Sequence, residues 1–249
     1  MEKSFDQTYK LFLILFAVQI VFSGYLFFRL KTLEKKGIVG GVQAAAPAAG
    51  TGAAAAPAGP EPTTDTSAMP AISDTDHIRG NKDADIVMVE YSDYECPFCK
   101  NFHPTTQQIL NDYGDKVALV YRHYPLSFHQ NAQKEAEAAE CIAELGGEDA
   151  FWRYTDTIFE RTTSNGTGFA LDKLQPLAEE LGVDGTSFQS CLDSGKYAQK
   201  VKDEEAGGAK AGISGTPGTI LVAKNGKRDF VSGAYPVESV KAQIDALLK

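Results

Sequence analysis

The sequence has little positive charge, few cysteines and no complete metal-binding motif. It carries 24 lysine and arginine residues against 33 aspartate and glutamate residues, which gives a net charge of −9. This acidic balance argues against nucleic acid as a partner, because a surface that binds nucleic acid must be basic. Of the four cysteines, two stand in one CxxC motif, and neither a second CxxC nor an HxxxH pair occurs. Long apolar runs are also lacking, with one exception near the N-terminus.

The exception is the segment from Leu11 to Phe28, which contains no charged residue and is mostly Leu, Phe, Ile and Val. As a helix it would be about 27 Å long, just enough to cross the hydrocarbon core of a membrane. A cleaved signal peptide is the alternative, but its apolar region is usually shorter and ends at small residues. This segment ends at Phe27-Phe28-Arg29. We therefore predict an N-terminal tail over 1–10 and an uncleaved transmembrane anchor over 11–28.

A region poor in core-forming side chains follows the anchor. Between residues 40 and 70 the chain is mostly Ala, Pro and Gly, with two acidic residues. Such a composition cannot bury a core, so we predict a flexible linker over 29–72. The remainder, 73–249, is long enough for one globular domain with a substantial core.

The CxxC motif is the centre of that domain. An apolar run over 86–91 predicts a buried strand, and Cys96-Pro97-Phe98-Cys99 follows at the start of a predicted helix. Proline is favoured at the first helical position, which places Cys96 at the helix cap, where free N–H groups and the helix dipole stabilise negative charge. Cys96 is therefore the expected thiolate nucleophile. Cys99 lies on the same helical face and can form a disulfide with it.

The alternative for a CxxC motif is half of a zinc site, which needs two more ligands. Cys141 and Cys191 stand alone in the sequence. His103 follows Cys96 by seven residues and is expected to be an ordinary surface or second-turn histidine. We favour a redox site and predict no metal.

The order of predicted elements indicates the fold class. Hydrophobic periodicity and turn signals predict strands at 86–91, 117–124, 219–223 and 229–232, and helices after Cys96 up to Gly114, then at 132–145, 151–159, 171–181, 184–192, 196–211 and 236–248. Asn225-Gly226 is a strong signal for a hairpin between the last two strands. The order β-α-β, helices, β-β-α predicts a thioredoxin-like α/β fold with a helical subdomain inserted at about 128–211.

Four segments of this domain resemble the DsbA-like thiol:disulfide oxidoreductases, thioredoxin-fold enzymes that handle the disulfides of exported proteins. The segments are 90–99 (EYSDYECPFC), 121–126 (YRHYPL), 191–195 (CLDSG) and 215–217 (GTP). The resemblance extends from about Asp76 to the C-terminus and includes the order of the motifs.

The resemblance implies a role for each matching residue. Cys96 matches the exposed attacking cysteine and Cys99 the buried resolving cysteine. Thr216-Pro217 matches the cis-proline loop that faces the disulfide, where backbone groups hold the substrate chain. With Pro97 and Phe98, these two residues are the expected substrate-binding residues. Pattern alone would favour a simple turn there, because only about 5–6% of X–Pro bonds in folded proteins are cis.

Glu90 matches an acidic residue that lies near the buried cysteine in the family. It stands six residues before Cys96, at the end of the predicted strand. A buried carboxylate has a raised pKa and could move the proton that Cys99 gains or loses. The strand pattern by itself leaves a solvent-facing Glu90 equally open.

Two positions depart from the family pattern. Pro97-Phe98 lacks the histidine that the most strongly oxidising relatives carry between their cysteines, and a phenyl ring cannot stabilise a thiolate as an imidazolium does. The strength of this protein as an oxidant is therefore left open. Gly218 follows Pro217 where many relatives carry a larger residue, so we expect a different substrate groove.

Cys141 and Cys191 both lie in the predicted helical insertion. In an oxidising compartment they are suited to a structural disulfide, which would stabilise the domain by a few kcal/mol. The alternative is a pair of buried free cysteines that pack as small apolar residues.

The charges beside the anchor conflict with the redox prediction on topology. Two lysines precede the segment, whereas Arg29, Lys31, Lys35 and Lys36 follow it. This bias alone would place the domain in the cytoplasm. A short N-terminal tail before a long translocated domain can override a modest bias, so we predict a single-pass cell-membrane protein with an extracytoplasmic domain.

The combined prediction is a membrane-anchored thiol:disulfide oxidoreductase that forms disulfides in exported proteins. It would need no cofactor, since the Cys96–Cys99 pair carries the redox chemistry. The expected partners are reduced or misoxidised exported proteins and a membrane redox partner that regenerates the enzyme. No dimerisation domain is visible, which favours a monomer. The alternatives are an extracytoplasmic reductase or isomerase and, from another class, a non-catalytic tethered binding module or chaperone.

Overall fold

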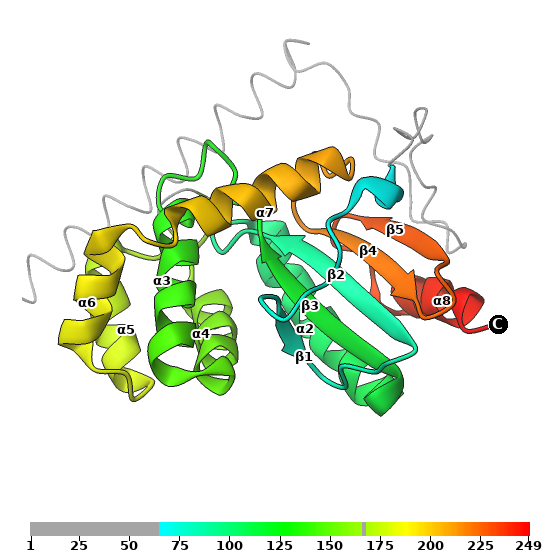
Figure 1. The fold of residues 1–249 in the computed structure, drawn as a ribbon, viewed down its shortest axis with the longest axis horizontal. Helices are drawn as coiled ribbons and strands as arrows, with labels where there is room; N and C mark the ends of the chain where they lie inside the picture. Colours follow the sequence, from blue (N-terminus) through cyan, green and yellow to red (C-terminus); the bar gives the residue numbers. More distant parts are fainter. Residues whose placement is uncertain (1–64, 166–167) are drawn as a thin grey trace, which may run out of the picture. The chain divides into compact units, whose positions relative to one another are not determined.

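The computed structural model of the protein describes residues 65–165 and 168–249 (Figure 1). The predicted transmembrane anchor at 11–28 and the linker up to residue 64 lie outside the described residues. Within the described part of the chain, no helix is both long enough and apolar enough to cross a membrane.

The described domain is built on one five-stranded sheet with the order β1-β3-β2-β4-β5. The strands are β1 (His77–Arg79), β2 (Ile86–Ser92), β3 (Val117–His123), β4 (Gly218–Ala223) and β5 (Arg228–Ser232). The central pair, β2 and β3, is parallel, whereas β1 pairs with β3, β4 with β2 and β5 with β4 in antiparallel fashion. Strand β1 is absent from the sequence prediction, since three residues are too few to show a hydrophobic period.

Helices α2 (Pro97–Tyr113) and α8 (Val237–Leu247) pack on the face of the sheet that bears the even-numbered side chains of β2. Helix α2 ends at Gly114, where a short 3-10 turn, η2 (Gly114–Lys116), leads into β3. The opposite face carries the odd-numbered side chains of β2 and is covered by α7 (Ala198–Lys210) and by the segment after η1 (Thr66–Ala68).

The packed part of the chain begins before the expected boundary at residue 73. Met69 is buried in the core of the sheet face that carries Tyr91. The backbone carbonyls of Pro70 and Ala71 accept hydrogen bonds from the guanidinium of Arg122, at 3.0 and 3.1 Å. The last residues assigned to the linker are therefore part of the domain.

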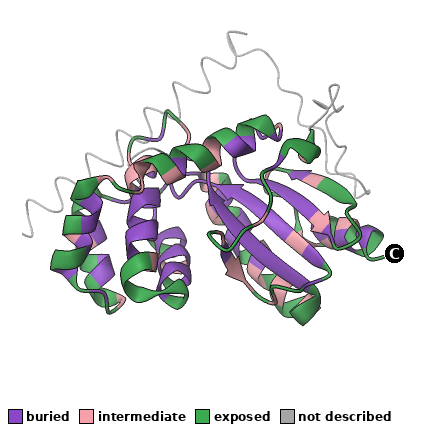
Figure 2. Ribbon diagram, viewed as in Figure 1, coloured by how far each residue is buried: buried purple, intermediate pink, exposed green. Residues whose placement is uncertain are grey.

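The insertion between β3 and β4 is helical, as the sequence predicts. It consists of α3 (Ala132–Gly146), α4 (Glu148–Arg161), the 3-10 turn η3 (Leu171–Lys173), α5 (Leu174–Glu180), α6 (Gly185–Ser194) and α7. The stretch expected as one helix over 171–181 is divided between η3 and α5, and Pro176 lies in the first turn of α5, where its missing N–H costs nothing. Buried residues run along the strands and cover all sides of the middle of α3, where every residue from 135 to 142 is buried (Figure 2).

An aromatic cluster joins the insertion to the sheet. Tyr94, in the turn after β2, contacts Tyr121 of β3 and Tyr154 and Phe159 of α4, with ring centroids 5.2–5.6 Å apart. Such contacts bury large apolar area and favour a fixed arrangement of rings. Through Tyr94, the cluster packs against the turn that leads to Cys96.

Candidate active site

Cys96 is the N-cap residue of α2, and Pro97 is the first helical residue, as the sequence predicts. The backbone of Cys96 is extended, with φ −76° and ψ 121°, so the helix begins directly after this cysteine. Cys99 lies in the first helical turn and is fully buried. Both cysteines are free thiols in this structure. The reduced state of the pair is therefore the state described.

The two thiols differ in acidity because of their surroundings. The pKa of Cys96 is lowered to about 6, first because the Cys99 thiol hydrogen-bonds to its sulfur. Burial opposes this shift, while Thr216 and the backbone N–H groups of Phe98 and Cys99 add to it. Burial raises the pKa of Cys99 well above its ordinary value, and the interaction with Cys96 raises it further. Near neutral pH, Cys96 is a thiolate and Cys99 a thiol.

The structure corrects the expectation that Cys96 is exposed. Only 2% of its surface is accessible, because the cis-proline loop covers it and its Sγ lies 3.4 Å from the carbonyl oxygen of Thr216. The neighbouring Phe98 is the exposed member of the motif, at 62%. A substrate must therefore reach the sulfur past Phe98 and the Thr216 backbone.

The loop opposite Cys96 contains a cis peptide bond between Thr216 and Pro217, as the family resemblance implies. The carbonyl of Pro217 accepts a hydrogen bond from the N–H of Gly233 at 2.9 Å, which ties the loop to the end of β5. Local packing explains why residue 218 is a glycine. A Cβ at this position would lie 3.0 Å from Ile213 Cγ2 and 3.3 Å from the carbonyl oxygen of Gly215.

Glu90 is buried, which excludes the solvent-facing alternative. Its carboxyl belongs to the face of β2 whose other side chains, Ile86 and Met88, share a core with Cys99. Burial raises the pKa of Glu90, and a hydrogen-bonding contribution from Ser92 only partly opposes the increase. Burial thus favours the protonated form of the Glu90 carboxyl over the charged form, compared with a carboxyl in water.

Buried polar atoms without a partner surround Glu90. In the register of the sheet, Tyr121 of β3 and Thr219 of β4 stand opposite Glu90, and His123 stands opposite Ser92. Ser92 Oγ, Tyr121 OH, Thr219 Oγ1 and His123 Nδ1 have no hydrogen-bond partner among the described residues. Unpartnered buried polar atoms are rare in native proteins and usually have a functional or hydration reason.

Two acidic residues that the sequence reasoning missed hold the active-site loop. Asp93 accepts hydrogen bonds from the backbone N–H of Leu126 at 2.7 Å and from His129 Nδ1 at 2.8 Å. Glu95 accepts from the N–H of Asn131 and the N–H of Gly168, both at 2.9 Å. These carboxylates fix two neighbouring loops around Cys96. A sequence signal existed, because both stand in the motif that carries the family resemblance.

His103 lies in the second turn of α2, as expected, but it is buried instead of being at the surface. Its Nε2 lies 2.9 Å from Asp156 Oδ1, in α4. Within the described ranges, no group of three or more His, Cys, Asp or Glu side chains is placed to hold a metal ion.

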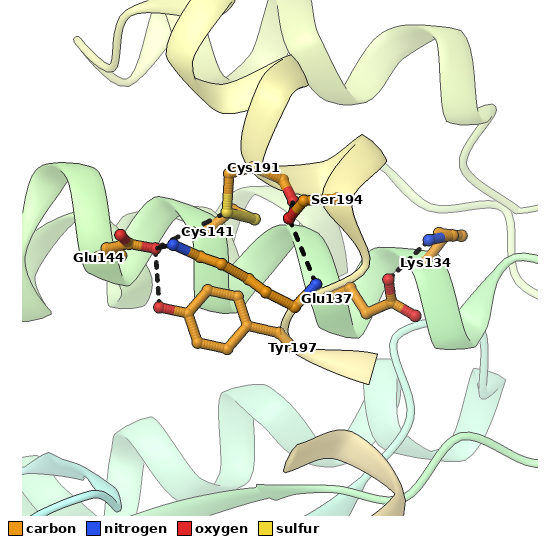
Figure 3. The surroundings of a disulfide bond; sticks show 8 residues. Lys134, Glu137, Cys141, Glu144, Cys191, Ser194 and Tyr197 are labelled. Atoms are coloured by element: carbon orange, nitrogen blue, oxygen red, sulfur yellow. Dashed lines mark hydrogen bonds and ion pairs between the residues drawn. A yellow bond between two sulfur atoms is a disulfide. The ribbon is translucent and has the colours of Figure 1, made fainter. Parts of the chain in front are cut away.

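Cys141 and Cys191 form a disulfide that joins α3 to α6, with Cα atoms 5.9 Å apart (Figure 3). Glu144 lies beside it and accepts a hydrogen bond from the hydroxyl of Tyr197 at 2.8 Å. This disulfide lies within the insertion, whereas Cys96 and Cys99 lie at the start of α2. The structure thus separates the four cysteines into a redox pair and a structural pair.

A low-pKa thiol at a helix cap, a buried partner thiol in the next turn and a facing cis-proline loop are typical of thiol–disulfide oxidoreductases with a thioredoxin fold. The chain belongs to the thioredoxin family, since the family model described as Thioredoxin matches residues 72–246. Its structural neighbours are DsbA-like oxidoreductases of the same superfamily.

Two solved structures illustrate this similarity. DsbA2 of Pseudomonas aeruginosa is 26% identical, and the match covers 72% of this chain and 96% of that chain, with a TM-score of 0.60. Oxidised BdbD of Bacillus subtilis shares the fold at 23% identity, over 70% of this chain and 92% of that chain, with a TM-score of 0.59.

The curated relatives are much longer proteins. One named Na(+)/H(+) antiporter NhaA 3, from Salinispora tropica, is 35% identical over 182 residues, which is 71% of this chain and 25% of the relative. Another, named Na(+)/H(+) antiporter NhaA, from Herminiimonas arsenicoxydans, is 32% identical over 177 residues, or 26% of its length. The chain spans about a quarter of the length of these relatives, so their names describe proteins that contain much more than the matched region.

Proposed function

We propose that this protein is a membrane-anchored thiol:disulfide oxidoreductase that forms disulfides in exported proteins through the Cys96–Cys99 pair. The observation that carries the proposal is the lowered pKa of Cys96, about 6. A stabilised thiolate favours the reduced form of the enzyme, so the disulfide form is the stronger oxidant. The low pKa also makes Cys96 a good leaving group when a substrate disulfide is released.

The oxidising reaction proceeds in two exchanges. A substrate thiolate attacks Cys96 Sγ, the Cys96–Cys99 bond breaks, and its electron pair goes to the Cys99 sulfur, which takes up a proton. A second substrate thiolate then attacks the substrate sulfur of the mixed disulfide, and Cys96 leaves as a thiolate. The products are a substrate disulfide and the reduced enzyme.

The surface around Cys96 supports an unfolded polypeptide as the substrate. Phe98 is 62% exposed and Phe128 is 70% exposed. Phe128 lies in the loop that Asp93 binds through Leu126 and His129. Exposed aromatic side chains beside a reactive group favour contact with apolar segments of a client chain. The backbone at Thr216-Pro217 offers hydrogen-bonding groups for an extended substrate.

The apolar segment at 11–28 supports attachment to the cell membrane with the domain outside the cytoplasm. An extracytoplasmic oxidase needs a partner that accepts its electrons, and a membrane redox protein is the chemical class that fits a tethered enzyme.

The residue before Cys99 is Phe98, which carries no charge that could stabilise the Cys96 thiolate. The hydrogen bond from the Cys99 thiol is therefore the largest contribution to the lowered pKa of Cys96.

The test is the reduction potential of the Cys96–Cys99 couple in the full-length protein, equilibrated with glutathione buffers, with Cys141→Ala/Cys191→Ala as a control for the second pair. We expect a potential more oxidising than that of the glutathione pool. A potential near that of thioredoxin would instead make the protein a reductase or isomerase. Cys96→Ser tests the other class, because a non-catalytic chaperone would keep its activity.

A further inference from the structure

Ser92 is a buried side chain of the active site to which the reaction above gives no role. It is the last residue of β2, two positions after Glu90, so both side chains point to the same face of the sheet. That face packs against α2, where Ile86 and Met88 of β2 share a core with Cys99. Ser92, Glu90 and Cys99 are all buried. Strand geometry and burial therefore direct the hydroxyl and the carboxyl toward the resolving thiol.

The Ser92 hydroxyl lies close enough to Glu90 and to Cys99 to affect the pKa of each. Burial dominates the raised pKa of Glu90, and hydrogen bonding with Ser92 is the next contribution, in the opposite direction. Burial also dominates the raised pKa of Cys99, and the same hydroxyl again acts to lower it. Ser92 Oγ nevertheless has no hydrogen bond of normal geometry to any described residue in the reduced state.

A serine hydroxyl can donate one hydrogen bond and accept two, and its hydrogen rotates freely. An uncommitted hydroxyl between an acid and a sulfur atom can therefore accept a proton from one while it donates its own to the other. The Cys99 thiol itself is engaged with the Cys96 sulfur in this state.

We propose that Ser92 Oγ is the relay that passes a proton between the Glu90 carboxyl and the Cys99 sulfur. The proposal rests on the function proposed above. When a substrate thiolate attacks Cys96, the S–S bond breaks and its electron pair goes to Cys99 Sγ. Ser92 donates its hydroxyl proton to that sulfur and accepts the proton of Glu90. The products are the substrate–Cys96 mixed disulfide, a Cys99 thiol and a Glu90 carboxylate, and the reverse order of transfers activates Cys99 for attack.

The experiment compares full-length wild type, Ser92→Ala and Ser92→Thr. The oxidised proteins are mixed with excess dithiothreitol, and reduction is followed by the fluorescence of the single tryptophan, Trp152, from pH 5 to 9. Reduction potentials are measured on the same preparations. Thr106→Val is the matched control, because it removes a buried hydroxyl of α2 whose hydrogen bond within the described part of the chain is to the carbonyl of His103.

A relay speeds both directions of a reaction equally, so its loss lowers rates and leaves the equilibrium unchanged. We expect Ser92→Ala to slow reduction about tenfold or more at neutral pH, with a flattened pH profile and an unchanged reduction potential. Ser92→Thr should restore most of the rate, and Thr106→Val should behave as wild type.

A Ser92→Ala protein with the rate of wild type would overturn the relay, and so would a rate loss accompanied by an equivalent shift of the potential. If the wild type itself failed to exchange disulfides, the proposed function would fail, which is a result distinct from either of these.

Discussion

At the scale of single residues, Cys96 and Cys99 show how position separates two identical side chains. Both are nearly inaccessible, yet the pKa of one is lowered and that of the other is raised. The main cause for Cys96 is the hydrogen bond from the Cys99 thiol, which stabilises the thiolate. The acidity of Cys96 is therefore a property of the pair.

This leads to a prediction for Cys99→Ala and Cys99→Ser. In reduced wild type, the Cys96 thiolate should titrate with a midpoint near pH 6, measured by absorbance at 240 nm or by the rate of alkylation. Alanine removes the donor, so the midpoint should move toward that of an ordinary thiol. Serine keeps a donor at the same position and should retain a lower midpoint than alanine. Equal midpoints in all three proteins would contradict this account.

Glu135 presents the opposite case, an ionisable group that the fold buries without compensation. Both of its carboxyl oxygens lack a partner among residues 65–165 and 168–249. Burial, and then the nearby Glu95 and Asp93, raise its pKa to about 9. The folded protein keeps this proton up to about pH 9, whereas the unfolded chain loses it near 4.5. Glu135 therefore costs stability increasingly as the pH rises between these values.

We predict that Glu135→Gln stabilises the protein at pH 8 by about 1–4 kcal/mol, since the amide is never ionised. At pH 4 the two proteins should be equally stable, because the carboxyl is then protonated in both states. Urea unfolding at pH 4, 6 and 8 checks this. A stabilisation of the same size at every pH would mean that shape, and not charge, is responsible.

The sequence predicts a site residue when its role follows from its own chemistry and local spacing, and fails when the role depends on distant parts of the fold. Cys96 and Cys99 could be placed from spacing and helix-cap chemistry alone. Glu90 could be named only through the resemblance, because one strand pattern allows either face. The loop-binding roles of Asp93 and Glu95 depend on contacts with residues more than thirty positions away, and no local pattern encodes such contacts.

At the scale of elements, α7 shows a conflict between helix propensity and packing. Gly207-Gly208 weakens the sequence prediction of this helix, because glycine is a poor helix former. The structure explains why each of these two positions is a glycine. A Cβ on Gly208 would lie 2.7 Å from Tyr91 Cδ1 and 2.9 Å from Tyr124 Cδ2, and one on Gly207 would lie 2.7 Å from the ring of Pro70. The glycines let α7 approach the sheet closely.

We therefore predict that Gly208→Ala destabilises the protein by about 1–3 kcal/mol through overpacking, although alanine favours a helix by about 1 kcal/mol. Ala209→Gly is the control, because Ala209 is exposed and reports helix propensity alone. Urea unfolding of both variants gives the comparison. A Gly208→Ala protein as stable as wild type would show that α7 can shift away from the sheet without cost.

Long periodic elements were predictable and short ones were not. The helix after Cys96 ends at Gly114 as expected, and the hairpin at Asn225-Gly226 joins β4 to β5. Strand β1 is held by its antiparallel pairing with β3 and by contacts of His77 and Arg79 with the insertion. Since those partners are distant in sequence, three residues of β1 carry no pattern of their own.

At the scale of the whole described domain, a buried charge cluster connects the sheet to the helical insertion. His77 Nε2 of β1 and His123 Nε2 of β3 both lie 3.1 Å from Glu140 Oε1 of α3, and Lys200 Nζ of α7 lies 2.6 Å from Glu140 Oε2. Burial would raise the pKa of Glu140, but the hydrogen bonds from His123 and His77 outweigh it and hold the pKa well below its usual value. One carboxylate thus joins four elements.

We predict that Glu140→Gln destabilises the protein by about 3–5 kcal/mol at neutral pH, because it leaves buried donors without their charged partner. A lowered pKa stabilises the folded state above the ordinary value near 4.5, and this contribution is lost as the pH falls below it. Wild type should therefore lose stability in acid through this group, whereas Glu140→Gln should lack that part of the slope. Urea unfolding from pH 3 to 7 measures both effects.

Glu137→Gln is the matched control, since Glu137 is also buried in α3 but, among the described residues, bonds only within its own helix, to Gln133 and Lys134. A pair within one helix contributes about 0.5 kcal/mol or less, so this variant should stay close to wild type. If both variants lost the same stability, burial of charge in α3 would matter and the connection to the sheet would not. A loss of stability confined to Glu140→Gln would show that the Glu140 carboxylate connects the insertion to the sheet.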